Sequence, residues 1–185
     1  MSARKSTVRI IGGEHRGRRL MFTDQNGDLR PTGDRMRETL FNWLQFELRD
    51  KRVLDLFAGS GVLGAEALSR GAAHAVLVEK KAERAADLSK QLKPVFADRV
   101  FIQLADALKW LPRAVGPFDV VFVDPPYDIG AQQPVCDLLV RHQLLAPGGW
   151  VYVESRRQDA QPSVPWLLEK EKTMGDAVAR LYPSL

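Results

Sequence analysis

The sequence has 185 residues, of which 45% are hydrophobic and 27% are charged. This composition is typical of a globular protein with one sizeable core, so we expect one main domain with an appendage. No apolar run approaches the roughly 20 residues that cross a bilayer, and the N-terminus lacks the apolar core of a signal peptide. The sequence therefore predicts a cytoplasmic protein that contacts no membrane.

Cysteine and histidine usage gives no sign of a disulfide or a metal centre. The single cysteine, Cys136, cannot form an internal disulfide, which agrees with a reducing compartment, and its apolar neighbours predict a core role. The histidines His15, His74 and His142 are scattered, without the cysteine or carboxylate spacing of a metal site. We predict no bound metal.

Positive charge is concentrated at the N-terminus. The first twenty residues contain six basic side chains and one acidic side chain, a net charge of +5, whereas the whole chain carries +4. The remaining residues therefore sum to −1. Such an asymmetry favours a polyanionic partner, because the arginine guanidinium forms bidentate hydrogen bonds with phosphate groups. The alternative is a solvated basic arm that only keeps the protein in solution.

The first elements are predicted to form a β-hairpin followed by a helix. Residues 7–13 and 18–23 are strand-like and flank a glycine-containing turn, which places Arg16, Arg18 and Arg19 at the hairpin tip. The apolar spacing of Met36, Leu40, Trp43, Leu44 and Leu48 predicts a helix that Asp34 caps, with Arg35, Arg37 and Glu38 facing outward. Arg30, Thr32 and Arg35 lie where hairpin meets helix and could reach into a crevice. We expect residues 1–29 to form an extension and residues 30–185 the main domain.

Strand-like and helix-like patterns then alternate, which predicts an α/β fold with a doubly wound, mostly parallel sheet. The predicted elements span residues 53–57, 63–69, 75–79, 82–92, 100–104, 107–111, 118–124, 134–142 and 150–154. Residues 166–173 and 177–182 then predict an antiparallel hairpin at the sheet edge. In such a fold the ligand site lies outside the carboxyl ends of the strands.

The first strand of this series ends in a glycine-rich loop that contains G-x-G-x-x-G at Gly59, Gly61 and Gly64. On its own this motif also suits a nicotinamide dinucleotide, with Glu79 at the spacing of a ribose-binding acid. Asp55 is a carboxylate inside an apolar strand and needs a partner, such as the ammonium of S-adenosylmethionine. Asp106 is placed either to accept a hydrogen bond from an adenine amine or to cap a helix, and both roles are compatible.

The stretch Asp124-Pro125-Pro126-Tyr127 follows a buried strand and is the predicted reactive centre. Proline has restricted φ and no backbone donor, so the turn offers rigid carbonyl acceptors. Asp124 and a proline carbonyl can accept the two hydrogens of an exocyclic nucleobase amine while Tyr127 stacks on the base. A Pro-Pro pair alone is more often a plain strand-ending turn, but the flanking Asp and Tyr favour the functional interpretation.

In this order, these motifs resemble class I S-adenosylmethionine-dependent methyltransferases that act on amino groups, which have a Rossmann-like sheet. The segments 10–13, 16–20, 30–32 and 35–42 further resemble the RsmD family, with the likeness extending over residues 8–155. Many members of that family have Phe where this chain has Tyr127, and both residues can stack. The resemblance implies methylation of a guanine N2 amino group in 16S ribosomal RNA, within a small-subunit ribosomal particle. We expect the enzyme to be a monomer.

The motifs and the resemblance together predict three groups of site residues. The catalytic group is Asp124, Pro125, Pro126 and Tyr127; the S-adenosylmethionine-binding group is Asp55, Phe57, Ala58, Gly59, Gly61, Glu79, Lys80, Asp106 and Ala107; the RNA-binding group is Arg16, Arg18, Arg19, Arg30, Thr32 and Arg35. The alternatives are a DNA adenine or cytosine amino methyltransferase, a protein glutamine methyltransferase, a nicotinamide-binding Rossmann protein and a non-catalytic RNA-binding module. Of these, a DNA enzyme usually needs a target-recognition domain for which this chain has little room.

Overall fold

The computed structural model describes residues 4–24 and 33–185. At the N-terminus, β1 (Arg4–Arg9) pairs antiparallel with β2 (Arg19–Asp24). The predicted hairpin is therefore present, but its first strand ends earlier than residue 13. Residues 10–18 instead form a loop that turns back on itself, closed by the Gly17 nitrogen donating to the Ile10 carbonyl at 2.8 Å.

The main domain is built on a seven-stranded sheet. In spatial order its strands are β5 (Val100–Leu104), β4 (His74–Glu79), β3 (Arg52–Asp55), β6 (Phe118–Val123), β7 (Leu145–Arg156), β9 (Ala177–Pro183) and β8 (Lys170–Met174). The five strands from β5 to β7 are parallel to their neighbours, whereas β9 runs antiparallel to both β7 and β8. The predicted doubly wound sheet and its C-terminal hairpin are confirmed.

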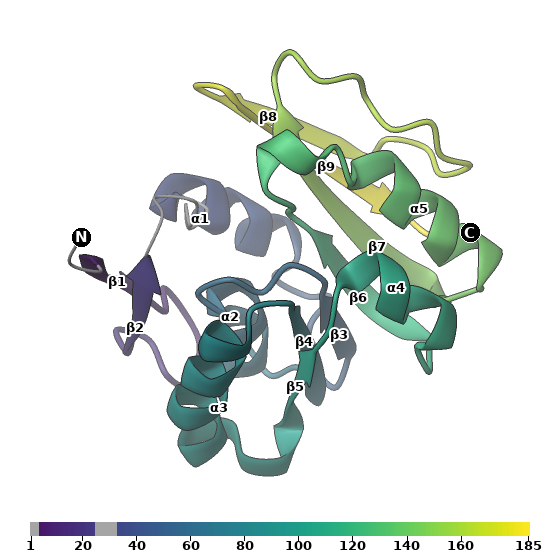
Figure 1. The fold of residues 1–185 in the computed structure, drawn as a ribbon. Coiled ribbons are helices and arrows are strands. Elements are labelled where there is room, and N and C mark those ends of the chain that lie inside the picture. The colour runs from purple at the N-terminus through teal and green to yellow at the C-terminus, as the bar shows by residue number, and fades with distance from the viewer. Residues whose placement is uncertain (1–3, 25–32) are drawn as a thin grey trace.

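Helices cover both faces of this sheet (Figure 1). They are α1 (Asp34–Trp43), α2 (Val62–Ser69) and α3 (Ala82–Phe96) on one face, and α4 (Ala107–Trp110) and α5 (Gln132–Arg141) on the other. Side chains of β6 alternate between the two cores: Phe122 packs with the α1–α3 layer and Val121 with the α4–α5 layer. Two-sided burial explains why β6 reads as an almost continuous apolar run.

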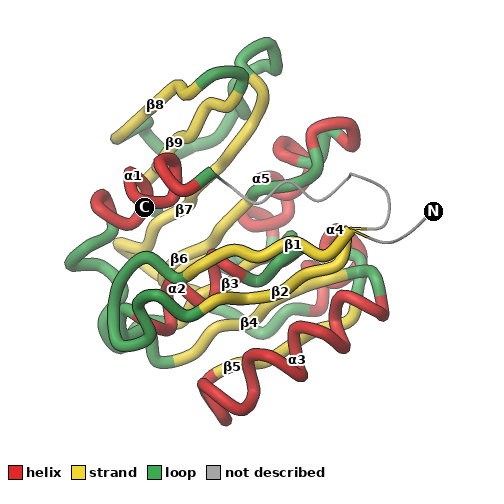
Figure 2. The backbone as a smooth tube through the Cα atoms, turned by 90° about the vertical axis from the view of Figure 1, so that its left-hand side faces the viewer, coloured by secondary structure: helices red, strands yellow, loops and turns green. Residues whose placement is uncertain are grey.

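The N-terminal hairpin lies on the α1–α3 face, beside α3 (Figure 2). Val8 and Leu20, one from each strand, are buried in the same core as the helices of that face. The Met21 backbone nitrogen donates to the Gln91 side chain of α3 at 2.6 Å. The hairpin is therefore packed against the main domain. The predicted boundary at residues 29 and 30 falls outside the described residues.

Two predictions for α1 are wrong. Gly33, not Asp34, occupies the N-cap position, and Asp34 is the first residue of the helix. Arg37, predicted to face outward, is fully buried, because the hairpin covers that side of the helix and the Arg9 carbonyl accepts from its guanidinium at 2.8 Å. Arg35 and Glu38 are exposed as expected.

Neither a membrane-spanning helix nor a metal centre is found in residues 4–24 and 33–185. No helix there is long and apolar enough to cross a membrane, and no group of three His, Cys, Asp or Glu side chains is arranged to hold a metal ion. Cys136 is buried in the α4–α5 core, where burial raises the pKa of its thiol to about 12. A thiol held in this neutral form is a core residue and not a nucleophile.

Candidate active site

The predicted cofactor and catalytic residues lie at one edge of the sheet, where the parallel strands end. Asp55, Glu79, Asp106 and Asp124 end or follow β3, β4, β5 and β6, which are neighbours in the sheet. A depression of about 840 Å³ lies elsewhere: Arg52, His74, Val100 and Phe118, the first residues of β3, β4, β5 and β6, contribute to its lining. That depression is at the amino ends of the strands, so it is separate from the candidate site.

Backbone geometry explains the glycines of the loop that follows β3. Gly59 and Gly61 both have positive φ, and Gly61 is the N-cap of α2. A Cβ atom on Gly61 would lie 2.4 Å from a methyl group of Leu88, and one on Gly64 would lie 2.6 Å from a methyl group of Leu77. The glycines therefore let the loop turn sharply and let α2 pack closely on its neighbours.

Asp55 is buried at the base of this loop. Its carboxylate accepts from the Gly64 nitrogen at 3.2 Å, and its side chain and backbone are only 1% exposed. Burial raises the pKa of Asp55 to about 7, an effect that hydrogen bonds from the Gly64 and Phe57 backbone partly oppose and that Glu79 reinforces. The structure thus gives Asp55 backbone partners of its own, in addition to the ammonium partner that we predicted.

Glu79, the last residue of β4, forms a hydrogen bond with the loop that follows β3. One of its carboxylate oxygens accepts from the Gly59 nitrogen at 3.1 Å and the other from the Lys81 nitrogen at 2.8 Å. The loop is further held by the Ala58 nitrogen, which donates to the Val78 carbonyl at 3.0 Å. Glu79 therefore lies against the glycine loop at the end of β4, whereas the neighbouring Lys80 is exposed.

Asp106 is the N-cap of α4. Its carboxylate accepts from the Leu108 nitrogen at 3.1 Å and from the Lys109 nitrogen at 3.3 Å, which confirms the helix-capping role. Its side chain is half-buried, and the following Ala107 is buried. Asp106 stands at the end of β5, two strands from the glycine loop across β4.

The Asp-Pro-Pro-Tyr turn leaves the sheet at the end of β6. Asp124 is half-buried, Pro125 is buried and Pro126 is exposed. The Pro126 carbonyl accepts from the Ile129 nitrogen at 3.3 Å and closes the 3₁₀ turn Tyr127–Ile129. Since β6 and β3 are adjacent, this turn and the glycine loop lie next to each other at the sheet edge.

Sequence reasoning missed the residues that support Tyr127. Its phenol donates to the Glu154 carboxylate at 3.0 Å, and the Tyr152 phenol donates to the other oxygen of that carboxylate at 2.8 Å. Burial raises the pKa of Glu154, and the two phenol hydrogen bonds oppose this effect. Glu154 ends the predicted strand 150–154 at the ligand edge, the same kind of position that Glu79 has at the end of the predicted strand 75–79.

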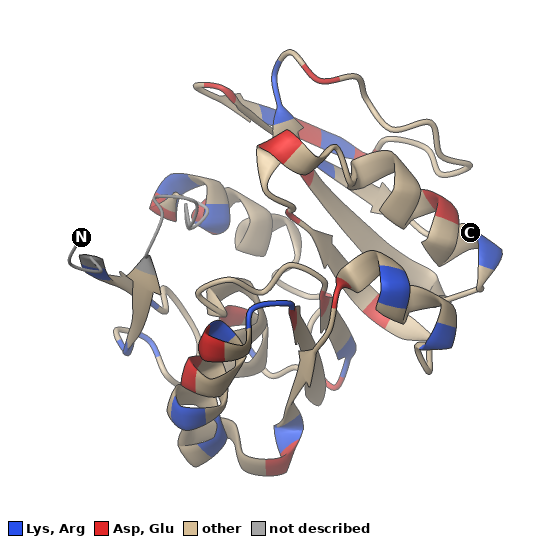
Figure 3. Cartoon of the chain, in the orientation of Figure 1, with Lys and Arg blue, Asp and Glu red and all other residues tan. Residues whose placement is uncertain are grey.

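The three hairpin arginines of the predicted RNA-binding group, Arg16, Arg18 and Arg19, are exposed, and they lie among the residues coloured blue in Figure 3. Arg35 is exposed on the first turn of α1. Arg30 and Thr32 lie outside the described residues. The structure therefore places Arg16 and Arg18 on the loop 10–18 and Arg19 at the start of β2. The Glu14 and His15 nitrogens of this loop donate to Ser69, the last residue of α2, so the loop lies at the opposite end of α2 from the glycine loop.

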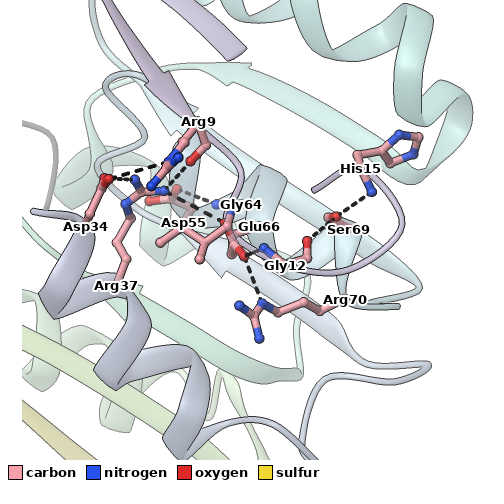
Figure 4. Close-up of polar contacts among 11 residues, drawn as sticks. Arg9, Gly12, His15, Asp34, Arg37, Asp55, Gly64, Glu66, Ser69 and Arg70 are labelled. Carbon is pink, nitrogen blue, oxygen red and sulfur yellow. Dashed lines mark hydrogen bonds and ion pairs between the residues drawn. The ribbon is translucent and has the colours of Figure 1, made fainter. Parts of the chain in front are cut away.

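Polar contacts to α2 hold this loop in place (Figure 4). The two oxygens of the fully buried Glu66 accept from the Ile11 and Gly12 nitrogens, each at 2.8 Å. Arg70 donates to Glu66 at 2.8 Å, and the Arg37 guanidinium lies 3.8 Å from it. Two buried or half-buried guanidinium groups thus offset the cost of burying the Glu66 charge, and none of these contacts was predicted.

The sheet order, the glycine loop and the carboxylates at the strand ends define a class I S-adenosylmethionine-dependent methyltransferase. The chain belongs to the family described as Conserved hypothetical protein 95, whose model matches residues 8–183. This membership confirms the resemblance to the RsmD family, and the nicotinamide and DNA-methylating alternatives gain no support from it.

Similar proteins agree with this assignment. The chain is 44% identical over 177 residues to ribosomal RNA small subunit methyltransferase D of Escherichia coli, covering 95% of this chain and 89% of that protein. It is 41% identical to the protein of the same name from Haemophilus influenzae, covering 96% and 94%. A solved structure of a putative methyltransferase from Escherichia coli matches with a TM-score of 0.85 and 42% identity, covering 96% and 98%.

Proposed function

We propose that the protein methylates the exocyclic N2 amino group of a guanine in 16S ribosomal RNA. One observation carries this proposal: the Asp-Pro-Pro-Tyr turn and the glycine loop follow the adjacent strands β6 and β3, so an amine held by the first faces a cofactor held by the second. The names of the two similar enzymes support ribosomal RNA of the small subunit as the substrate.

The residues at the ends of β3, β4 and β5 fit S-adenosylmethionine. Gly59 and Gly61, both at positive φ, let the loop turn sharply at the end of β3, and Glu79 lies against that loop for the ribose hydroxyls. Asp55 would support the methionine end, Phe57, Ala58 and Lys80 would line the site, and Asp106 with Ala107 would contact the adenine. When bound, the cofactor supplies a sulfonium methyl group that is already electrophilic.

The chain's own contribution to the reaction is positioning. Asp124 and the Pro125 or Pro126 carbonyl would accept the two amine hydrogens, so that the nitrogen lone pair points away from the turn. Tyr127 would stack on the guanine and hold it outside the RNA fold. Correct alignment of the reacting groups can contribute several kcal/mol. The nitrogen becomes positively charged and strongly acidic once it has bonded to the methyl group, so it releases its proton after the transfer and no dedicated general base is required.

We assign RNA binding to the basic hairpin. Arg16, Arg18 and Arg19 would contact phosphates, and Arg30, Thr32 and Arg35 would extend this surface toward the site. Phosphate contacts orient the RNA without reading its sequence. The proposal includes a monomeric, cytoplasmic enzyme that acts on a small-subunit particle, with residues 1–29 as the RNA-binding extension of a catalytic domain at residues 30–185.

Mass mapping of methylguanine in 16S ribosomal RNA tests the proposal. RNA from cells that lack this protein should miss one N2-methylguanine, and supplying the parent protein should restore it. An Asp124→Ala variant, expressed to the same level, serves as the control for catalysis. An unchanged methylguanine map in cells without the protein would overturn the proposed substrate. Parallel assays with naked RNA and with small-subunit particles distinguish the two forms of the substrate.

A further inference from the structure

Tyr127 is held by a residue far away in the sequence. The turn places its ring half-exposed beside Asp124, while its phenol donates to Glu154 at 3.0 Å. Glu154 itself is only 5% exposed and lies in β7, two residues before the strand ends at Arg156. A buried carboxylate that accepts from a phenol forms a charge-assisted bond, which is stronger and more directional than one between neutral groups.

Strand β7 presents three alternate residues to this turn. Tyr152 donates to Glu154 at 2.8 Å, and Arg156 donates to the Tyr127 carbonyl at 3.4 Å, with its guanidinium 6.0 Å from the centre of the Tyr127 ring. Residues separated by two positions share one face of a strand, which explains why all three converge. The amide of Gln132 on α5 fixes the backbone of the same strand by donating to the Glu154 carbonyl at 3.2 Å.

These contacts restrain the one ring that the proposed function requires to be in a fixed place. A phenylalanine at position 127 would offer the same stacking surface, but its ring could rotate and shift without losing a polar contact. We propose that Glu154 is a positioning residue for methyl transfer, fixing the Tyr127 ring and therefore the guanine stacked on it. This inference rests on the proposed function, and it assigns Glu154 no contact with the substrate.

A double-mutant cycle between Tyr127→Phe and Glu154→Gln tests this role. The single-turnover rate is measured on small-subunit particles with saturating S-adenosylmethionine, after activity of the parent protein has been established. Tyr127→Phe should lower the rate about 3- to 10-fold, the worth of one well-placed hydrogen bond, with unchanged cofactor affinity. In the Glu154→Gln background the same change should cost less than about 2-fold, because the charged acceptor is already gone.

Tyr152→Phe is the matched control, because it removes the other hydrogen bond to the same carboxylate and leaves Tyr127 in place. In a cycle with Glu154→Gln, Tyr152→Phe should show coupling in the free energy of unfolding and much less coupling in the single-turnover rate. If Tyr127 and Glu154 are coupled only in the unfolding free energy, their bond is structural and the inference is wrong. If Glu154→Gln does not fold, Tyr127→Phe alone decides, since a parental rate in that variant contradicts the proposal. Failure of the proposed function is a separate result, seen as an inactive parent.

Discussion

Gly13 lies so close to Ser69 that a Cβ atom on Gly13 would be 2.0 Å from the Ser69 carbonyl oxygen. The φ angle of Gly13 is +78°, a region that residues with side chains rarely adopt. The next residue's nitrogen, that of Glu14, donates to the same Ser69 carbonyl at 2.8 Å. Glycine at position 13 is therefore required both by the backbone conformation and by the close approach of the hairpin loop to α2.

We predict that Gly13→Ala detaches the hairpin loop from α2. The collision and the strained φ should together lower the free energy of unfolding by more than the roughly 1–3 kcal/mol of backbone strain alone. Gly17→Ala is a matched control, because Gly17 has a φ of +85° but no heavy atom within 4 Å of its Cβ position. Chemical denaturation measures both, and equal losses of stability in the two variants would show that the contact with Ser69 contributes nothing.

The charge asymmetry predicts the effect of removing the hairpin arginines. Replacing Arg16, Arg18 and Arg19 by Ala should weaken RNA binding and leave S-adenosylmethionine affinity unchanged. Each lost phosphate contact should reduce the log–log salt slope by about 0.7–0.9. The control replaces the exposed Lys109, Arg113 and Arg141, which lie on or beside α4 and α5. A salt slope that is the same for both triple variants would return the hairpin to a solubilising role.

Glu79 is expected to contribute directly to cofactor binding. Glu79→Ala should weaken S-adenosylmethionine binding by about 1.5–3 kcal/mol, the range for a hydrogen bond to a charged group. Because Glu79 also accepts from the Gly59 nitrogen, thermal unfolding without the cofactor must be measured beside titration calorimetry. Parental affinity in this variant and in Asp55→Ala would remove both residues from the cofactor site.

The raised pKa of Asp55 predicts how stability depends on pH. The folded protein binds a proton at Asp55 up to a pKa of about 7, whereas the unfolded chain releases it near 3.8. Asp55 therefore makes its full contribution to the free energy of unfolding below pH 3.8, and this contribution is lost as the pH rises to about 7. Asp55→Asn cannot lose a proton in this way. Between pH 4 and about pH 7, the free energy of unfolding of the variant should therefore rise by a few kcal/mol relative to that of the parent. Denaturation of both proteins from pH 4 to pH 8 measures the difference, and parallel curves would contradict it.

Local pattern and chain order were enough to predict the sheet and most of the ligand edge. Residues 100–104 form β5 as predicted, and the glycine loop, Glu79 and Asp124 all follow strands that the pattern identified. Long-range contacts were not predictable in this way. Arg37 resembles an exposed helix residue until the hairpin covers it, and Glu154 lies 27 residues from the phenol that it binds. A partner distant in the sequence leaves no periodic signal at either residue.

The Asp-Pro-Pro-Tyr turn allows catalysis and binding to be separated. Asp124→Ala removes a proposed acceptor for the amine and leaves the glycine loop, Glu79 and the hairpin arginines in place. Turnover should fall about 10²- to 10³-fold, because the lost interaction strengthens chiefly as the nitrogen attacks, whereas RNA affinity should change little. Asp128→Ala is the matched control, since Asp128 is an exposed carboxylate in the same turn.

Tyr127→Ala should instead lose roughly 1–3 kcal/mol of base stacking, so it should impair RNA binding or positioning far more than Tyr127→Phe does. Single-turnover methylation of small-subunit particles with saturating S-adenosylmethionine measures all four variants. An Asp124→Ala enzyme that works at the parental rate would mean that another group accepts the amine. A Tyr127→Phe enzyme as impaired as Tyr127→Ala would mean that the phenol, and not the stacking surface of the ring, is what the reaction requires.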